Sequence, residues 1–266
     1  MRHFDVHSRS EIGRVRETNE DHILVGRFIE NQGAITLRFA ASDDFLSCQG
    51  MLFAVADGVG GYAGGRMASK LALNAFDAQF YSAEKGADVL AGAAEALQAA
   101  ASRANQTILD VASRRPEWAN MGCTLAGVCL APEGYLVFHA GDSRVYRFRN
   151  GVGKQLTRDD SIVSLAVEAG QMTPQEAEHS PARHTITNVV GSSSFQLHLE
   201  QGPPLRNGDI LLICSDGLHD MLSHEELERC AGASSPLESK VDAWIQAALD
   251  AGGHDNISLI AILCQD

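Results

Sequence analysis

The sequence predicts a single domain that combines β-strands with α-helices. Six short apolar runs are rich in Val, Ile, Leu and Phe and are mostly bounded by Gly or Asp, as buried strands are. Two longer segments repeat apolar residues every three or four positions, which is typical of helices that pack against a core. The 266 residues contain no internal repeat, low-complexity tract or linker. We therefore expect one domain over residues 1–266, although the length alone would also allow two.

These patterns place the expected elements along the chain. Strands are expected at Met51–Ala56, Thr124–Leu130, Tyr135–Ala140, Val145–Arg149, Ile210–Cys214 and Ile257–Cys264. Helices are expected at Gly65–Phe80 and Ala87–Arg115, and a weaker pattern indicates a third at Ser239–Ala251. The polar stretch from Arg158 to Val190 has room for a short helix at Ser161–Gly170, and long irregular segments of this kind are often functional loops.

The charge balance and the apolar runs exclude several classes of protein. Lys and Arg number 21 against 34 Asp and Glu, which gives a net charge of −13 and argues against a nucleic-acid partner. The longest apolar runs, such as Ile257–Cys264, are far shorter than the roughly 18 residues that span a bilayer. The N-terminus lacks the apolar stretch of a signal peptide, and the six cysteines form no Cys-x-x-Cys pair. We expect a cytoplasmic protein with reduced thiols and no membrane insertion.

Acidic residues stand at the ends of the expected strands. Asp57, Asp142 and Asp216 each come at the end of one strand, whereas Asp255 precedes the last strand. Any one of them alone is most often a turn residue. If the last strand runs antiparallel to the others, the four carboxylates meet at one edge of a sheet, where they repel each other unless a cation neutralises them. A cluster of Asp without His or Cys favours Mg²⁺ or Mn²⁺ over Zn²⁺.

A fifth acidic group lies upstream, where Arg16 stands a few residues before Glu20 and Asp21. One interpretation is a solvated charge run on the surface. The other is that the guanidinium of Arg16 holds a phosphate beside metal-bound carboxylates, since its planar fork matches phosphate oxygens. The local sequence leaves both open.

Seven short motifs occur in a fixed order from about Ser8 to the C-terminus. They are Arg-x-x-Asn-Glu-Asp (16–21), Asp-Gly-Val-Gly-Gly (57–61), Met-Gly-x-Thr-Leu (121–125), Gly-Asp-Ser-Arg (141–144), Leu-Thr-x-Asp (156–159), Ser-Asp-Gly-Leu (215–218) and Gly-Gly-His-Asp-Asn (252–256). Through these motifs the chain resembles the PP2C (PPM) family of metal-dependent protein Ser/Thr phosphatases, in its compact bacterial form.

The resemblance implies a fold and a metal centre. The fold is an α+β antiparallel β-sandwich flanked by helices, with four layers in the order α-β-β-α and a flap subdomain at about residues 160–190. Two Mn²⁺ or Mg²⁺ ions bind at one end of the sandwich in this family. Asp57 would bridge the two ions, Asp216 and Asp255 would complete the first site, and the carbonyl of Gly58 would contribute to the second.

The remaining site residues are implied in the same way. Asp21 and Glu20 would act on the ions from a second layer through bound water. Asp142, together with Asp216, matches the position of a weaker third metal site. Arg16 matches the arginine that binds the substrate phosphate, and with Asp57 it would form the catalytic core.

The implied activity is hydrolysis of phosphoserine and phosphothreonine in proteins, by attack of a hydroxide that bridges the two ions. The implied partners are phosphorylated proteins, above all a cognate Ser/Thr kinase and its targets, and we expect a monomer. Eukaryotic members carry His where this chain has Val59. The proton donor to the leaving group therefore stays open among metal-bound water, Tyr62 and His184.

Two other functions are compatible with parts of the sequence. The stretch Gly58–Ala63 fits the dinucleotide-binding pattern G-x-G-x-x-A, but the acidic residue expected at the end of a second strand is missing, since Asp77 falls inside an expected helix. A pseudophosphatase that binds phosphoproteins without turnover would usually have lost a ligand position, and here all the ligand positions are present.

His139, which lies inside an apolar strand, is interpreted as a satisfied core residue rather than a ligand. The segment Asn31–Gly50 is longer than a hairpin loop and is a candidate partner surface.

Overall fold

Two six-stranded antiparallel sheets face each other at the centre of the computed structural model, which describes residues 2–60 and 63–266. Tyr62, one of the three candidate proton donors, lies outside the described residues. The strand order of the first sheet is β11-β10-β13-β14-β1-β4, and that of the second is β12-β9-β8-β5-β2-β3. The first sheet contains β1 (His3–Glu11), β4 (Gly33–Ala40), β10 (Arg144–Arg149), β11 (Val152–Gln155), β13 (Ile210–Cys214) and β14 (Ile257–Gln265). The second contains β2 (His22–Val25), β3 (Phe28–Glu30), β5 (Met51–Ala56), β8 (Leu125–Ala131), β9 (Gly134–Ala140) and β12 (His198–Gly202).

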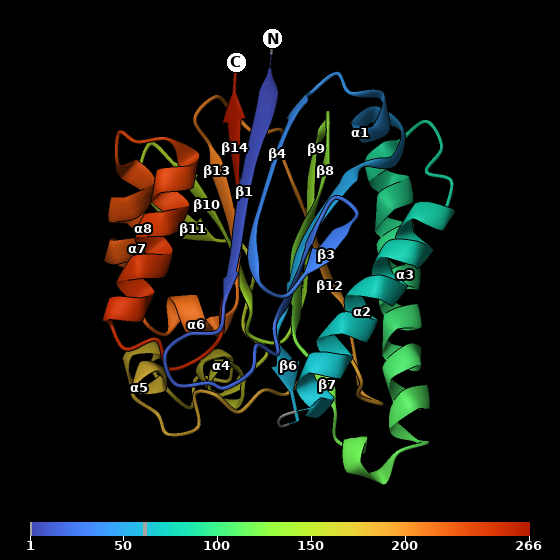
Figure 1. Cartoon of the computed structure of the whole chain (residues 1–266), viewed down its shortest axis with the longest axis vertical. Coiled ribbons are helices and arrows are strands. Elements are labelled where there is room, and N and C mark those ends of the chain that lie inside the picture. The colour runs from blue at the N-terminus through green and yellow to red at the C-terminus, as the bar shows by residue number, and fades with distance from the viewer. Residues whose placement is uncertain (1, 61–62) are drawn as a thin grey trace.

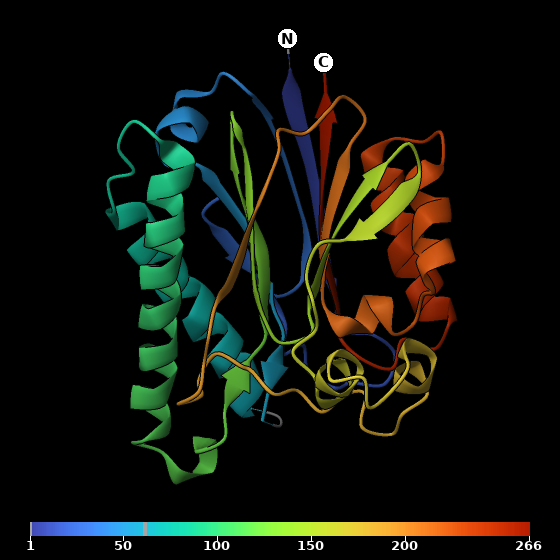
Figure 2. The same ribbon diagram turned by 180° about the vertical axis from the view of Figure 1, so that it is seen from behind.

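Helices cover the outer face of each sheet, so the molecule has four layers in the order α-β-β-α (Figures 1 and 2). The long antiparallel pair α2 (Ala63–Ser82) and α3 (Val89–Ala112) packs on the second sheet, and α7 (His224–Gly232) with α8 (Leu237–Asp250) packs on the first. A separate apolar core, which includes Phe53 and Ile260, fills the space between the two sheets. The predicted α+β sandwich is confirmed.

The smaller elements gather mainly at one end of the sandwich, the lower end in Figure 1. The two-stranded sheet of β6 (Gly58–Val59) and β7 (Gly122–Cys123) lies there, with α4 (Ile162–Glu168), α5 (Pro174–Glu178) and α6 (Asp216–His219). The helix α1 (Asp44–Gln49) lies at the other end, and a short 3₁₀ helix covers Pro116–Trp118. The helices α4 and α5 each begin at an N-cap residue whose hydroxyl accepts a hydrogen bond from a backbone amide of the first turn. These residues are Ser161 for α4 and Thr173 for α5.

The six predicted strands and the three predicted helices are all present, and no end differs from its predicted position by more than three residues. The predicted short helix in the flap is also present, as α4. The segment Asn31–Gly50, the candidate partner surface, contains the edge strand β4 and the helix α1. Among the described residues, no helix is long and apolar enough to cross a membrane.

Candidate active site

The four aspartates at the strand ends meet at the end of the sandwich that carries β6 and α6. Asp57 follows β5 and Asp142 follows β9, both in the second sheet, whereas Asp216 follows β13 and Asp255 precedes β14 in the first. The expectation that one edge of one sheet would collect them is wrong in this respect. Two facing sheets contribute two carboxylates each, and because β13 and β14 are antiparallel, the end of one strand and the start of the other lie together.

A cavity of about 590 Å³ opens between these strand ends. Its wall contains all but one of the predicted site residues, namely Arg16, Glu20, Asp57, Gly58, Asp142, Asp216 and Asp255. The exception is Asp21, which is buried beside the cavity and repels the charge of Asp57. The structure therefore brings the whole predicted set together.

The carboxylates are crowded and incompletely paired. Burial, and then repulsion from neighbouring carboxylates, raises the pKa of Asp57 and of Asp216 well above the ordinary range. Burial likewise raises the pKa of Asp142, and that of Asp21 to about 7. One oxygen each of Glu20, Asp21, Asp142 and Asp216 is buried without a hydrogen-bond partner. Buried carboxylate oxygens without partners are unfavourable unless a cation binds them, so this donor set fits hard divalent ions.

Hydrogen bonds from the end of β8 hold Asp57 in place. The Asp57 amide donates to Oγ1 of Thr124 at 3.2 Å, and the Thr124 amide donates to the Asp57 carbonyl at 2.8 Å. Next to it, Gly58 lies against the start of α2: a Cβ on Gly58 would lie 2.3 Å from the carbonyl carbon of Gly65. Any larger residue at position 58 would therefore force the backbone at the start of α2 to shift.

Asp21 is fixed by hydroxyl and amide groups. Ser215 donates from Oγ to one carboxylate oxygen of Asp21 at 2.8 Å, and the Ser258 amide donates to the same Ser215 hydroxyl at 3.0 Å. The Asp21 amide donates to the side-chain oxygen of Asn19 at 3.1 Å. One oxygen of Asp21 is thus occupied and the other is left without a partner.

Arg16 lies on the loop between β1 and β2, at the rim of the cavity. Its Nη2 donates to Oδ2 of Asp255 at 2.6 Å, and this hydrogen bond is the main reason that the pKa of the guanidinium is raised. The side chain is 53% exposed, so a ligand that enters the cavity can reach it. The contact with a carboxylate of the cluster favours the functional interpretation over a solvated surface charge.

Asn256 positions this loop, which the sequence analysis did not foresee. Its amide nitrogen donates to the carbonyls of Ile12 at 2.9 Å and Thr18 at 3.0 Å, and its oxygen accepts from the Glu20 amide at 2.8 Å. Asn256 belongs to the motif Gly-Gly-His-Asp-Asn. Its contacts with Ile12 and Thr18, however, join residues that are 244 and 238 positions apart in the chain, and no local sequence pattern indicates such contacts.

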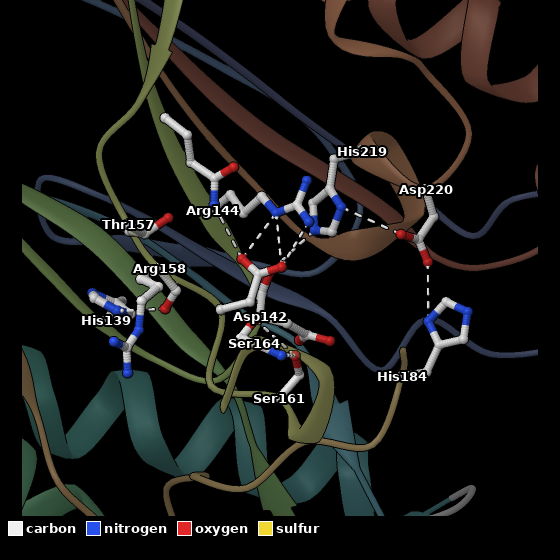
Figure 3. Close-up of polar contacts among 12 residues, drawn as sticks. His139, Asp142, Arg144, Thr157, Arg158, Ser161, Ser164, His184, His219 and Asp220 are labelled. Carbon is white, nitrogen blue, oxygen red and sulfur yellow. Dashed lines mark hydrogen bonds and ion pairs between the residues drawn. The ribbon is translucent and has the colours of Figure 1, made fainter. Parts of the chain in front are cut away.

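A chain of polar contacts leads from Asp142 to the flap (Figure 3). His219 donates from Nε2 to the backbone carbonyl of Asp142 at 3.0 Å and lies 3.4 Å from Asp220 through Nδ1. Asp220 also contacts Nδ1 of His184 at 3.2 Å, and His184 lines the cavity. Of the candidate proton donors, His184 is thus placed at the cavity with a carboxylate that orients its ring.

The topology contradicts the dinucleotide-binding alternative. That motif requires a parallel strand after the helix, whereas β8, the neighbour of β5 that follows α2 and α3, pairs with β5 in antiparallel register. Asp77, the only acidic residue considered for the ribose contact, instead forms an ion pair with Arg27 on the surface of α2.

Comparison with known proteins agrees with this geometry. The sequence profile of the family Protein phosphatase 2C matches residues 40–259. The Ser/Thr protein phosphatase PstP of Mycobacterium tuberculosis is 33% identical over 253 residues, which are 95% of this chain and 43% of PstP. The Ser/Thr phosphatase Stp of Listeria innocua is 29% identical over 257 residues, 96% of this chain and 93% of Stp. The chain thus spans less than half of the mycobacterial relative and nearly all of the listerial one.

A solved structure supports the same assignment. The catalytic domain of PstP in complex with two manganese ions superposes with a TM-score of 0.77 at 30% identity, and the match covers the full length of both chains. The motifs in their order, the four-layer sandwich and the matched profile lead to one conclusion: the chain belongs to the protein phosphatase 2C family of metal-dependent phosphoprotein phosphatases.

Proposed function

We propose that this chain hydrolyses phosphoserine and phosphothreonine in proteins and opposes a Ser/Thr kinase in signalling. The observation that supports the proposal most directly is the cluster of carboxylates from two sheets, with buried oxygens that lack partners, beside an accessible arginine. Among the described residues, no cysteine lines the cavity, and Cys123 and Cys214 are fully buried with thiol pKa values that burial raises, so a phosphoenzyme intermediate formed on cysteine is not favoured.

The cluster is proposed to hold two Mn²⁺ or Mg²⁺ ions. Asp57 is the proposed bridging ligand, Asp216 and Asp255 the ligands of one ion, and the Gly58 carbonyl a ligand of the other. When bound, two such ions supply an activated water as nucleophile and stabilise negative charge on the phosphoryl group. Asp21 and Glu20 are proposed to hold ordered water behind the ligands, and Asp142 with Asp216 to form a weaker third site.

Arg16 is proposed to bind the phosphate. Its guanidinium is held at the rim by Asp255, with the side chain half exposed, so its planar fork can donate hydrogen bonds to two phosphoryl oxygens. The positive charge then stabilises both the bound substrate and the charge that develops on those oxygens during transfer. Asn256 contributes indirectly, because it fixes the loop that carries Arg16.

His184 is proposed to protonate the leaving alkoxide. It lines the cavity, and its Nδ1 contacts Asp220 at 3.2 Å, so the carboxylate favours a proton on Nδ1 and orients the ring. A serine or threonine alkoxide is a poor leaving group, and a positioned acid typically contributes about 10²- to 10⁴-fold to such a step.

The direct test uses a phosphothreonine peptide with added Mn²⁺. The proposal predicts release of phosphate that stops on chelation with EDTA, returns with Mn²⁺ and is abolished in Asp57→Asn. Asp242→Asn, which changes an exposed carboxylate on α8 that pairs with Arg9, is the matched control and should keep full activity. Binding of the phosphopeptide without turnover under all these conditions would instead identify a pseudophosphatase.

A further inference from the structure

A group of two histidines and one aspartate that could hold a metal ion lies outside the carboxylate cavity. His139 on β9 and His198 on β12 are direct cross-strand partners, and Asp160 lies at the start of the flap. One ligand atom from each of the three lies within 4.8 Å of the other two. The prediction that the His139 side chain is satisfied is confirmed, since its Nε2 has a hydrogen-bond partner. The residue is half-buried, however, and it is not isolated, because it adjoins a second imidazole and a carboxylate.

The three side chains are held in orientations that suit ligation. The rings of His139 and His198 stack with centroids 4.8 Å apart and planes inclined by 28°. Oδ1 of Asp160 lies 3.1 Å from Nε2 of His198. The other carboxylate oxygen of Asp160 accepts from the Gly141 amide at 3.0 Å and from the side-chain amide of Asn188 at 2.7 Å. One oxygen is thus fixed by the protein and the other faces the histidines, as in sites where outer hydrogen bonds orient a ligand.

The charge state of the cluster also favours a metal. Burial lowers the pKa of His139, so its ring is neutral near pH 7. Its Nε2 donates to the backbone carbonyl of Arg158 at 2.9 Å, which fixes the plane of the ring (Figure 3). Neutral imidazole is the form that binds metal ions. The carboxylate of Asp160 is only 9% exposed, so a cation bound to it would be shielded from competing water.

We propose that His139, Asp160 and His198 form a binding site for a transition-metal ion of the Zn²⁺ type. Two imidazoles and one carboxylate are the borderline donor set that suits Zn²⁺, in contrast to the all-oxygen set of the catalytic cavity. Ligand bonds of about 2.0–2.2 Å require the three ligand atoms, which lie within 4.8 Å of one another, to move closer together when the ion binds. A water molecule would complete the coordination.

An ion at this site would stabilise the two ends of the flap, the segment of about residues 160–190. The Asp160 amide donates to the Gly141 carbonyl at 2.9 Å, next to Asp142, and the Thr187 amide donates to the Asp160 carbonyl at 2.7 Å. Asp160 therefore joins both ends of the flap to the turn after β9. A metal that also binds His139 and His198 would tie this junction to the edge of the second sheet, independently of the proposed catalytic activity.

The test compares Zn²⁺ binding by the wild type, His198→Ala and a matched control. The control is His224→Ala, because His224 is 50% exposed and pairs with one carboxylate at 3.4 Å, much as His198 is 40% exposed and pairs at 3.1 Å. Zn²⁺ bound per chain is measured by equilibrium dialysis with metal analysis, in excess Mg²⁺. Any Zn²⁺ in the catalytic cavity is common to all three proteins and cancels in the comparison.

The wild type and His224→Ala are expected to bind one more Zn²⁺ per chain than His198→Ala. Loss of an outer contact weakens metal sites about 10- to 100-fold, so loss of a direct ligand should weaken binding at least as much. Equal Zn²⁺ content in all three proteins would overturn the proposal and leave a hydrogen-bonded His–Asp pair. If His198→Ala fails to fold, anomalous diffraction from wild-type crystals grown with Zn²⁺ decides instead: a peak between the three side chains supports the site, and its absence refutes it.

Discussion

Removal of the negative charge of Asp21 should raise the free energy of unfolding of the metal-free protein. In the metal-loaded protein the same change should impair the ordered water that Asp21 is proposed to hold. Asp21 is fully buried, and its pKa is raised to about 7 from 3.8, chiefly by burial. The folded state therefore keeps the Asp21 proton up to about pH 7, whereas the unfolded chain loses it near pH 3.8. Between these values the folded state binds more protons, so its stability falls as the pH rises.

The size of the effect follows from the same shift. A rise in pKa from 3.8 to about 7 corresponds to about 4 kcal/mol at pH values above 7, because each pKa unit is worth about 1.4 kcal/mol. Asp21→Asn removes this term and keeps an oxygen that can accept from Ser215. In EDTA at about pH 8, we therefore expect the variant to be more stable than the wild type by up to about 4 kcal/mol, and to lose this advantage toward about pH 4.

Urea denaturation in EDTA at these two pH values, followed by circular dichroism, measures the difference. Asp242→Asn serves as control, because that carboxylate is 56% exposed and its removal should change the free energy of unfolding little at either pH. With saturating Mn²⁺ the wild type should regain stability, since ligands that bind only the folded state stabilise it. A destabilised Asp21→Asn at about pH 8, or an advantage that does not shrink toward low pH, would refute the argument that uncompensated buried charge dominates this site.

Three further predictions concern catalysis. Arg16→Ala should lower kcat/KM on a phosphothreonine peptide about 10- to 150-fold, because charge-assisted hydrogen bonds are worth about 1.5–3 kcal/mol. Arg16→Lys should recover only part of this loss. Unchanged kinetics with unchanged metal content would show that Arg16 is a solvated surface charge and does not bind the phosphate. Asp142→Ala should leave two tightly bound Mn²⁺ ions but weaken the response to millimolar Mn²⁺, which calorimetric titration measures; an unaltered weak site would remove Asp142 from metal binding. His184→Asn should lower kcat on the phosphothreonine peptide about 100-fold and change hydrolysis of p-nitrophenyl phosphate little, since p-nitrophenolate needs no proton to leave; equal losses on both substrates would assign His184 another role.

Much of the fold was predictable where burial is complete. Strands such as β5 and β13 are buried along their whole length, so their sequences are continuous apolar runs. The strand β1 escaped prediction because its inward positions include Ser8 and Ser10, whose hydroxyls bind other polar groups instead of forming an apolar face. The edge strand β4 was missed for a different reason: most of its residues are exposed or half-buried, so it lacks a clear apolar pattern.

The site, too, was predictable in part: its acidic residues were, and the contacts that orient them were not. Asp57, Asp142, Asp216 and Asp255 were visible because each adjoins an apolar strand, so the strand pattern itself locates them. The contacts that orient the site were not visible. The hydrogen bonds of Asn256 to the Arg16 loop, the contact of His184 with Asp220 and the adjacency of His139 and His198 all depend on which distant segments become neighbours in the fold. Local periodicity carries no information on that pairing.

The measurement that tests the central claim most directly is the number of Mn²⁺ ions that the carboxylate cavity binds, determined by calorimetric titration together with phosphopeptide turnover. The account predicts two tightly bound ions in the wild type, with turnover that rises as they bind. In folded Asp57→Asn it predicts loss of tight binding and of turnover together. Turnover that persists in the metal-free wild type, or tight binding of both ions by Asp57→Asn, would contradict it.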